Sequence, residues 1–393
     1  MQRSWSWLAG LAVLVLPLLG VATVLGQEAV GVPRADPVAP SQEVTAIGDI
    51  HGDLETFRAL LQRAGLTDSE DRWIGGKRHF VQTGDFLDRG AGSRGVMDLL
   101  ARLEKESSAA GGRATILLGN HEIMNMAGDL VNTTVAEFAA YVDLEDPADR
   151  ETHRKKILTY LRDGCPLLRS SYTRQFGAVL TESSFNRYFP PGFFGHRAAL
   201  APEGKYGRWL LTHDFVYKEG RTLYLHGGLS QRYGLLQRSQ INDAVREQLR
   251  KLLDAVAKIE ALGAFERSLG YRELLYLIQS ERRAGGPRPE LAPLFAAVLE
   301  AHESILFDEE GPLWYRGLAQ GNERLLADGL RATLAAQDVD QIVIGHTQPD
   351  SLRVEGRFGN RVILIDTGMN QLVYKGCPSA VVVPLKGPVR VIE

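Results

Sequence analysis

The sequence predicts an α/β fold in which candidate functional residues gather at the ends of strands. Five short apolar runs have the length and composition of buried strands, and helical patterns follow the first two. Each run leads to a residue that can bind metal, next to a glycine. Strand, loop and helix in alternation indicate α/β structure, and this succession taken alone suggests a parallel sheet. The runs are VTAI (44–47), HFVQT (79–83), ATILL (114–118), TLYL (222–225) and QIVI (341–344).

The first run leads into GDIHG (48–52), where Asp49 and His51 are placed two residues apart. Both side chains can therefore face one ion. A helix is predicted over 53–64, because its apolar residues recur on one face. Asp53 stands at the start of that helix, where aspartate is a preferred cap. Asp49 and His51 are thus candidate ligands, whereas Asp53 is explained by the helix.

The other four runs lead to similar residues, and a second helix is predicted over 93–106. A single Asp before Gly is usually a turn residue, and a single His after a strand usually has no special role. Here, however, four of only nine histidines stand beside strand ends. Ligands of α/β proteins bind at such ends. The candidate residues after these runs are Asp85, Asp88, Arg89, Asn120, His121, His226 and His346.

This mixture of side chains indicates a particular chemistry. Carboxylate and amide oxygens combined with imidazoles suit Mn, Fe or Zn, and two such ions sharing a carboxylate are a device for phosphoester hydrolysis. Arg89 is of the type that binds phosphate oxygens. Arg316 in GPLWYRG (311–317) is a second candidate, although this segment can also be a packed amphipathic loop.

Two stretches interrupt the α/β succession, at about 125–220 and 235–305, and we expect them to be insertions that cap the core. Residues 134–163 have a helical pattern, and most of 235–305 is helical as well. RYFPPGFFGHRAAL (187–200) is expected to be an aromatic, proline-rich loop. ERRAGGPRPE (281–290) is expected to be an exposed linker between helices.

The amino terminus predicts export. Residues 1–26 carry one early arginine, an uncharged apolar run and small residues before Gln27, as in a secretory signal peptide. An uncleaved anchor is the competing interpretation. Residues 27–42 are predicted to be a linker, and 43–393 the folded domain. The mature protein is therefore expected to be periplasmic or secreted.

Composition limits the choice of partners. The 393 residues include 45 Lys and Arg against 48 Asp and Glu, a net charge of −3, which gives no electrostatic reason to expect nucleic acid. No later segment is apolar enough to span a bilayer, so membrane association is expected only through an uncleaved signal segment. Whether Cys165 and Cys377 form a disulfide stays open.

The motifs resemble those of a known family. GDIHG, GDFLDRG (84–90) and GNHE (119–122), in this order, are similar to the motifs of the PPP-type, calcineurin-like metallophosphoesterases. HGGLS (226–230) and GHT (345–347) are similar to the family's later histidine motifs, so the resemblance covers roughly 44–370. It implies an α/β fold built as a four-layer α/β/β/α sandwich with mixed sheets and helical insertions. This replaces the expectation of a parallel sheet.

Within the family, GRWL (207–210), GPLWYRG and the helical insertions resemble the Shewanella-like protein phosphatases, a bacterial-type branch. IDTGMN (365–370) stands where eukaryotic Ser/Thr phosphatases carry a motif with a tyrosine. That tyrosine is missing, so the pocket is expected to differ.

The resemblance also implies roles for the motif residues around two divalent ions (Mn, Fe or Zn). The implied ligands are Asp49 and His51 for the first ion, Asp85 as the bridge, and Asn120, His226 and His346 for the second. His121 would protonate the leaving oxygen, with Asp88 holding its imidazole. Arg89 and Arg316 would bind phosphate oxygens.

The implied function is hydrolysis of phosphomonoesters, with a metal-bound hydroxide as nucleophile. The expected substrate is a phosphorylated protein, at phosphotyrosine, phosphoserine or phosphothreonine. A hydrolase of small phosphate esters, such as nucleotides or dinucleoside polyphosphates, is the alternative, because one centre can serve many substrates.

Overall fold

The computed structural model describes residues 43–177, 180–385 and 387–393. The predicted signal segment (1–26) and linker (27–42) lie outside the described residues. Among the described helices, none is long and apolar enough to cross a membrane. Cys165 and Cys377 both carry free thiols.

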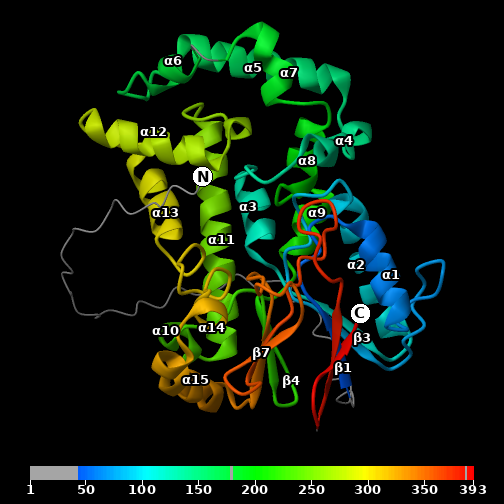
Figure 1. The fold of residues 1–393 in the computed structure, drawn as a ribbon. Helices are drawn as coiled ribbons and strands as arrows, with labels where there is room; N and C mark the ends of the chain where they lie inside the picture. Colours follow the sequence, from blue (N-terminus) through cyan, green and yellow to red (C-terminus); the bar gives the residue numbers. More distant parts are fainter. Residues whose placement is uncertain (1–42, 178–179, 386) are drawn as a thin grey trace, which may run out of the picture. The chain divides into compact units, whose positions relative to one another are not determined.

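Two five-stranded sheets form the centre of the fold (Figure 1). The first has the strand order β10-β9-β1-β2-β3 and the second β4-β5-β6-β8-β7. In each, three neighbouring strands pair in parallel, and the remaining strand pairs are antiparallel. The strands are β1 (Glu43–Ile47), β2 (His79–Gln82), β3 (Arg113–Ile116), β4 (Val216–Glu219), β5 (Thr222–Leu225), β6 (Gln341–Ile344), β7 (Glu355–Arg357), β8 (Val362–Leu364), β9 (Ala380–Pro384) and β10 (Arg390–Ile392).

All five predicted strands exist, but the parallel sheet suggested by their succession is wrong. The mixed sheets implied by the family resemblance are confirmed. The antiparallel strands β4, β7, β9 and β10 change the sheet type, and none of them was predicted. Three of them border short hairpin connections or the chain end, where a strand of three or four residues leaves little periodicity to detect.

The helices fall into those that cover the sheets and those of the two insertions. They are α1 (Leu54–Arg63), α2 (Ser93–Ala109), α3 (Asn120–Ala127), α4 (Val135–Ala139), α5 (Pro147–Asp163), α6 (Tyr172–Gly177), α7 (Phe185–Tyr188), α8 (Phe193–Leu200), α9 (Lys205–Leu210), α10 (Gln231–Gly234), α11 (Arg238–Ala261), α12 (Tyr271–Arg283), α13 (Ala292–His302), α14 (Gly317–Gln320) and α15 (Glu323–Gln337), with 3₁₀ turns η1 (Val142–Leu144), η2 (Glu182–Ser184) and η3 (Arg267–Leu269).

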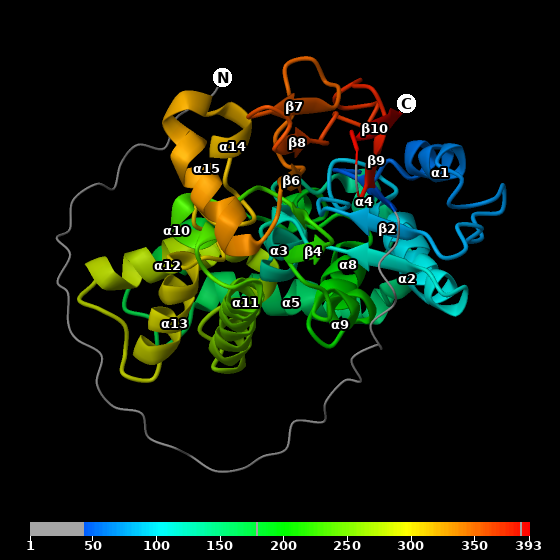
Figure 2. The same cartoon turned by 90° about the horizontal axis from the view of Figure 1, so that it is seen from below.

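The layers follow from the alternation of side chains along the strands. Val44 and Ala46 of β1 belong to an apolar cluster with Val343 of β6, which fills the space between the sheets. Ile47 points the other way and packs with Phe57 of α1. Figures 1 and 2 show α1 and α2 on one side of the two sheets and α10 and α15 on the other, which completes the four layers.

The structure corrects two predictions within the insertions. Residues 187–200 are not a loop throughout, because α8 begins at Phe193. Gly192 (φ 86°) makes the turn that precedes α8, and Phe193 packs with Phe189 and Phe138 in a separate apolar cluster. The expected exposed linker 281–290 begins inside α12. There the buried Glu281 carboxylate accepts hydrogen bonds from the Arg169 and Ser170 N–H groups.

The structure confirms Asp53 as the cap of α1. Its Oδ1 accepts the Thr56 N–H at 3.1 Å, and its Oδ2 accepts the Gln371 N–H at 3.0 Å. We expect Asp53→Ala to lower the free energy of unfolding by about 1 kcal/mol, because the amino end of α1 loses its acceptor. Urea denaturation measures this. Glu55→Ala, at an exposed position in the same turn, is the control, and an equal loss in both variants would contradict the cap.

Candidate metal centre

The six predicted ligand residues are buried together at the carboxyl ends of parallel strands. They are Asp49, His51, Asp85, Asn120, His226 and His346. They follow β1, β2, β3, β5 and β6, strands that come from both sheets. The loops that carry them therefore meet at one place, as the sequence predicts.

His226 shows how closely these loops approach. Its Nε2 atom lies 3.2 Å from Asp85 Oδ2, 2.9 Å from Asn120 Oδ1 and 3.1 Å from His346 Nδ1. Its Nδ1 atom lies 3.1 Å from the Thr83 carbonyl oxygen, a contact that fixes the orientation of the ring. The Nε2 atom is therefore held among candidate metal-ligand atoms contributed by three other loops.

Two groups of side chains can each hold a metal ion. His51, Asp85 and His121 offer ligand atoms that all lie within 4.8 Å of one another, and so do Asp85, His226 and His346. Asp85 belongs to both groups, which fits a carboxylate that bridges two ions. His121 lies in the first group although the sequence predicts it as an acid.

Asp49 lies at the edge of this cluster. Its Oδ2 atom is 3.9 Å from His51 Nε2, and its Oδ1 atom accepts the His346 N–H at 3.0 Å. A side chain at Gly345 would collide with this carboxylate. Asp49 therefore joins the loop after β1 to the loop after β6, and its carboxylate still points toward the candidate ligands.

Backbone strain is concentrated in these loops. Among the described non-glycine residues with φ in the left-handed region are five of the predicted site residues: His51, Asp85, Asp88, Arg89 and His346. Each such conformation costs on the order of 1 kcal/mol or more. Strain of this kind persists only where the surroundings hold it, and it clusters at functional sites.

The electrostatics of the cluster fit bound cations. Burial, reinforced by the charges of Asp366 and Asp85, raises the pKa of Asp49 well above its usual value. Burial also opposes the ionised form of Asp85, but the charges of His226 and His121 outweigh it and hold the pKa of Asp85 well below its usual value. A divalent ion would relieve the repulsion between these carboxylates.

The imidazoles are also suited to metal binding. Burial lowers the pKa of His51 and of His346 well below the usual value, so both rings are neutral, as ligands must be. Among the described residues, the buried Nε2 atom of His346 has no hydrogen-bond partner. The donor set and this unpartnered atom together fit a metal centre.

Asp366 is a site residue that our sequence reasoning missed. It follows β8, is buried, and lines the same cavity as Asp85 and His346. Burial raises its pKa, and the charge of Asp85 adds to that shift. The signal was present in the sequence, because VILID (362–366) is a sixth apolar run that ends in an aspartate before Thr-Gly.

Glu122 of the GNHE motif is a second missed residue. Its buried carboxylate accepts the N–H groups of Asp85, Phe86, Leu87 and Gly119 at 2.7–3.1 Å. Burial and the charge of Asp85 nevertheless raise the pKa of Glu122 to about 7. Glu122 therefore fixes the backbone of the GDFLDRG loop to the start of α3, and it acts by positioning Asp85.

The predicted acid pair is present. His121 Nδ1 lies 2.6 Å from Asp88 Oδ2, and Asp88 Oδ1 accepts the Thr133 hydroxyl at 2.7 Å. Glu137 Oε1 of α4 accepts the Asp88 N–H at 3.1 Å. The first insertion thus holds the carboxylate that orients His121, a contribution that no motif indicates.

The two predicted phosphate-binding arginines line one cavity of about 480 Å³ with four of the candidate ligands, His51, Asp85, Asn120 and His346. Arg89 reaches His51 Nε2 at 2.9 Å and His121 Nε2 at 3.2 Å. Arg316 Nη1 donates to the His346 carbonyl oxygen at 2.9 Å. Arg316 is an exposed side chain that lines this cavity, so the alternative of a merely packed loop does not account for it.

A tyrosine does reach the cavity, although it does not lie in the IDTGMN segment where the motif of the eukaryotic phosphatases would place it. Tyr374 lies nine residues after Ile365, and its ring stands 5.3 Å from the Arg89 guanidinium carbon and 6.0 Å from the His51 ring. IDTGMN itself lacks a tyrosine, as noted from the sequence. The loop that follows supplies one, because it folds back over the loop after β1, where Asn370 Nδ2 donates to the His51 carbonyl oxygen at 2.7 Å.

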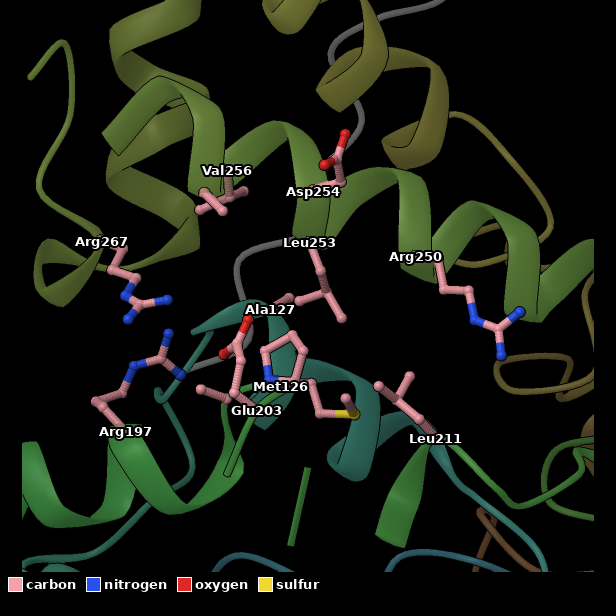
Figure 3. A pocket seen from close by; sticks show the side chains of 13 residues that line it. Met126, Ala127, Arg197, Glu203, Leu211, Arg250, Leu253, Asp254, Val256 and Arg267 are labelled. Carbon is pink, nitrogen blue, oxygen red and sulfur yellow. The ribbon is translucent and has the colours of Figure 1, made fainter. Parts of the chain in front are cut away.

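Helix α3, which carries Asn120 and His121, is anchored at its other end beside a separate cavity of about 240 Å³ (Figure 3). Arg197 Nη1 donates to the Asn125 carbonyl oxygen at 2.7 Å. Figure 3 shows the side chains of Arg197 and Arg267 pointing toward one another at one side of this cavity. Burial and the charge of Arg267 lower the pKa of Arg197 to about 10.

A carboxylate shared between two groups of imidazoles, with arginines that line the same cavity, is typical of metal-dependent phosphoesterases. The chain belongs to the calcineurin-like phosphoesterase family, whose sequence profile matches residues 43–350. This family uses a centre of two metal ions, and the structure provides candidate ligand groups for it.

Similar proteins support the resemblance to the Shewanella-like branch. Shewanella-like protein phosphatase 2 of Arabidopsis thaliana is 37% identical over 215 residues, which cover 52% of this chain and 51% of that protein. This chain thus spans about half of that relative's length. Shewanella-like protein phosphatase 1 of Plasmodium berghei is 22% identical over 348 residues, 88% of this chain and 72% of that protein.

The fold has a solved counterpart. The crystal structure of a cold-active protein-tyrosine phosphatase from a psychrophilic Shewanella species superposes with a TM-score of 0.54. The alignment covers 90% of this chain and 81% of that one, at 21% identity. At this identity the likeness shows the fold.

Glu137 predicts a pH dependence of stability. Burial and the charge of Asp88 raise its pKa to about 8. An unfolded chain releases this proton near 4.5, so unfolding becomes more favourable as the pH rises between these values. Glu137→Gln stays neutral throughout. We therefore expect its free energy of unfolding, relative to wild type, to increase by more than about 1 kcal/mol from pH 5 to pH 8.

Urea denaturation at both pH values, in the same metal-free buffer, measures the difference. Glu55→Gln, at an exposed position of α1, is the matched control and should show no such increase. A Glu137→Gln difference that is equal at pH 5 and pH 8 would show that Glu137 is already ionised in the folded protein.

Proposed function

We propose that this chain is a two-metal protein phosphatase that removes phosphate from phosphotyrosine, phosphoserine or phosphothreonine side chains. One observation carries the proposal: Asp85 joins two metal-ligand groups and lines a cavity that is also lined by Arg89, Arg316 and His121, whose imidazole is hydrogen-bonded to Asp88. Relatives named protein phosphatases support the choice of a protein substrate. Export rests on the predicted signal segment alone and is part of the proposal.

The metals proposed are Mn, Fe or Zn, which suit mixed oxygen and imidazole ligands. Asp49, His51 and Asp85 would hold one ion, and Asp85 with Asn120, His226 and His346 the other. Asp366 lines the same cavity, and we add it as a candidate ligand or as a partner of Asp49. When bound, two such ions activate water and neutralise the charge on the phosphate.

The protein's own residues would divide the remaining work. Arg89 and Arg316 enter the cavity from different loops, so they would donate hydrogen bonds to the phosphate oxygens from two sides. Asp88 accepts from His121 Nδ1 and fixes the tautomer that carries a proton there. The Nε2 atom faces Arg89 and Asp85, within the cavity, where the protonated ring could donate to a leaving oxygen.

The substrate class is tested by a panel of phosphotyrosine peptide, phosphothreonine peptide and diadenosine tetraphosphate, each with added Mn. We expect the purified enzyme to release phosphate from a peptide with a kcat/KM at least tenfold above that for the dinucleotide. Boiled enzyme and enzyme treated with chelator are the controls. Turnover of the dinucleotide alone would replace the protein phosphatase by the small-ester hydrolase.

The role of His121 is tested by His121→Asn. Removing a general acid typically costs about 10²- to 10⁴-fold, and the cost falls on substrates with poor leaving groups. We expect kcat to fall by about 10²-fold or more on a phosphoserine peptide and much less on para-nitrophenyl phosphate. Metal analysis should still find two ions per chain.

His153→Asn, which alters a histidine of α5 that stacks on Phe194, is the control for this experiment. A His121→Asn variant that loses one ion would identify His121 as a ligand, consistent with its place among His51 and Asp85. Equal losses on both substrates, with both ions retained, would remove the acid role.

A further inference from the structure

An apolar pocket of about 320 Å³ adjoins the catalytic cavity, and both are lined by Asp129 and Arg272. We call it the flanking pocket. It is built by both insertions: α7, α8 and the loop 128–134 come from the first, and η3 and α12 from the second. Its apolar lining residues include Leu130, Val131, Tyr188, Phe189, Phe193 and Leu269.

The boundary between the two cavities is an ion pair. Arg272 Nε donates to Asp129 Oδ1 at 2.8 Å. The Gly128 carbonyl oxygen accepts the Tyr271 N–H at 3.1 Å, which fixes the loop to the start of α12. The boundary is therefore held in place by bonds between the two insertions.

The same loop is bonded to the catalytic residues. The Asn132 carbonyl oxygen accepts the Arg89 N–H at 3.1 Å, and the Thr133 hydroxyl donates to Asp88. One short segment thus borders the flanking pocket on one side and supports the predicted phosphate-binding and acid residues on the other. A group bound in the flanking pocket would lie beside a phosphate bound at Arg89.

The flanking pocket leaves apolar side chains open to solvent. Val131 is 59% exposed and Tyr188 47%. Phe189 and Phe193 behind them are buried and meet edge to face, with ring centroids 5.0 Å apart. Single exposed apolar residues are ordinary. Two at the mouth of an apolar pocket that adjoins a charged catalytic cavity indicate a binding surface.

We propose that the flanking pocket is a substrate subsite, which binds an aliphatic or aromatic side chain close in sequence to the phosphorylated residue of a phosphoprotein. The inference rests on the proposed function and deepens it. An extended peptide advances about 3.3 Å per residue, so a side chain near the phosphorylated residue can enter an adjoining pocket while the phosphate stays in the cavity.

The chemistry of the flanking pocket favours a peptide over a nucleotide. A nucleobase placed among Val131, Phe189 and Leu269 would meet mostly apolar side chains. Polar atoms of its edge that Ser268 or Glu273 did not reach would stay without partners, which is costly. The charge of Arg272 at the boundary is paired with Asp129, so it offers little attraction to a second phosphate of a polyphosphate chain. An apolar side chain needs no such partners and gains the burial of its surface.

The experiment compares phosphotyrosine peptides that differ only beside the phosphorylated residue. One pair carries Leu or Ser on the amino-terminal side and one pair on the carboxyl-terminal side, and para-nitrophenyl phosphate is the reference without a flanking group. We expect the wild-type enzyme to prefer Leu over Ser about tenfold in kcat/KM in one of the pairs. The effect should lie mainly in KM, since it reflects binding away from the reacting atoms.

Val131→Asp and Tyr188→Ser test the subsite, because both side chains are exposed and their replacement should not unfold the protein. We expect each variant to reduce the Leu-over-Ser preference to less than about threefold, and to lose more kcat/KM on the Leu peptide than on para-nitrophenyl phosphate. Leu325→Asp alters a residue of α15 that is 83% exposed. It is the matched control and should retain the wild-type preference.

Each outcome decides the matter. Peptides that are hydrolysed with no preference between Leu and Ser would overturn the subsite and leave the protein phosphatase intact. A preference that Val131→Asp and Tyr188→Ser leave unchanged would place it elsewhere and also overturn the subsite. Hydrolysis of diadenosine tetraphosphate without hydrolysis of any peptide would overturn the proposed function itself.

Discussion

The Asp85 residue is bonded to the loops after three other strands, and the arrangement of the site depends on these bonds. Its carbonyl oxygen accepts the His51 N–H, and its Oδ1 atom accepts the His121 N–H, both at 3.0 Å. Its Oδ2 atom lies 3.2 Å from His226 Nε2. Since Asp85 is itself held by Glu122 in a left-handed conformation, any shift of this residue would displace ligands contributed by both sheets.

The insertions extend this dependence beyond the strand ends. Thr133 and Glu137 hold Asp88, which in turn orients His121, and Arg272 of the second insertion is paired with Asp129 of the first. The strands therefore fix the candidate ligands, whereas the insertions fix His121 and Asp88, the predicted acid pair, and shape the space beside the cavity. A division of this kind lets one metal chemistry serve different substrates, because the insertions can change without moving the ligands.

Sequence reasoning succeeded where short patterns carry the information. Apolar runs ending beside glycine placed Asp49, Asp85 and His226 at strand ends, and the cap pattern separated Asp53 from them. It failed where the information is spatial. The antiparallel strands that were not predicted lead to no candidate site residue, and three of them have only three or four residues. The role of Glu122 depends on backbone groups of another loop, and the contacts of Glu137 and Tyr374 with the site arise only when distant segments fold together.

Buried carboxylates and strained loops around the candidate metal centre both lower the stability of the chain, and ion binding would offset this cost. Asp49, Asp85 and Asp366 lie together with opposed pKa shifts, so burial and mutual repulsion disfavour the ionised forms of Asp49 and Asp366 in a chain without cations. Bound divalent ions would favour those ionised forms, and their binding energy would then count toward folding. The backbone strain of left-handed residues such as His51, Asp85 and His346 also lowers the free energy of unfolding, a loss that ion binding would offset. The strain and the buried carboxylates thus lower the stability of the metal-free chain. In return, they hold the ligands in the arrangement that metal ions require.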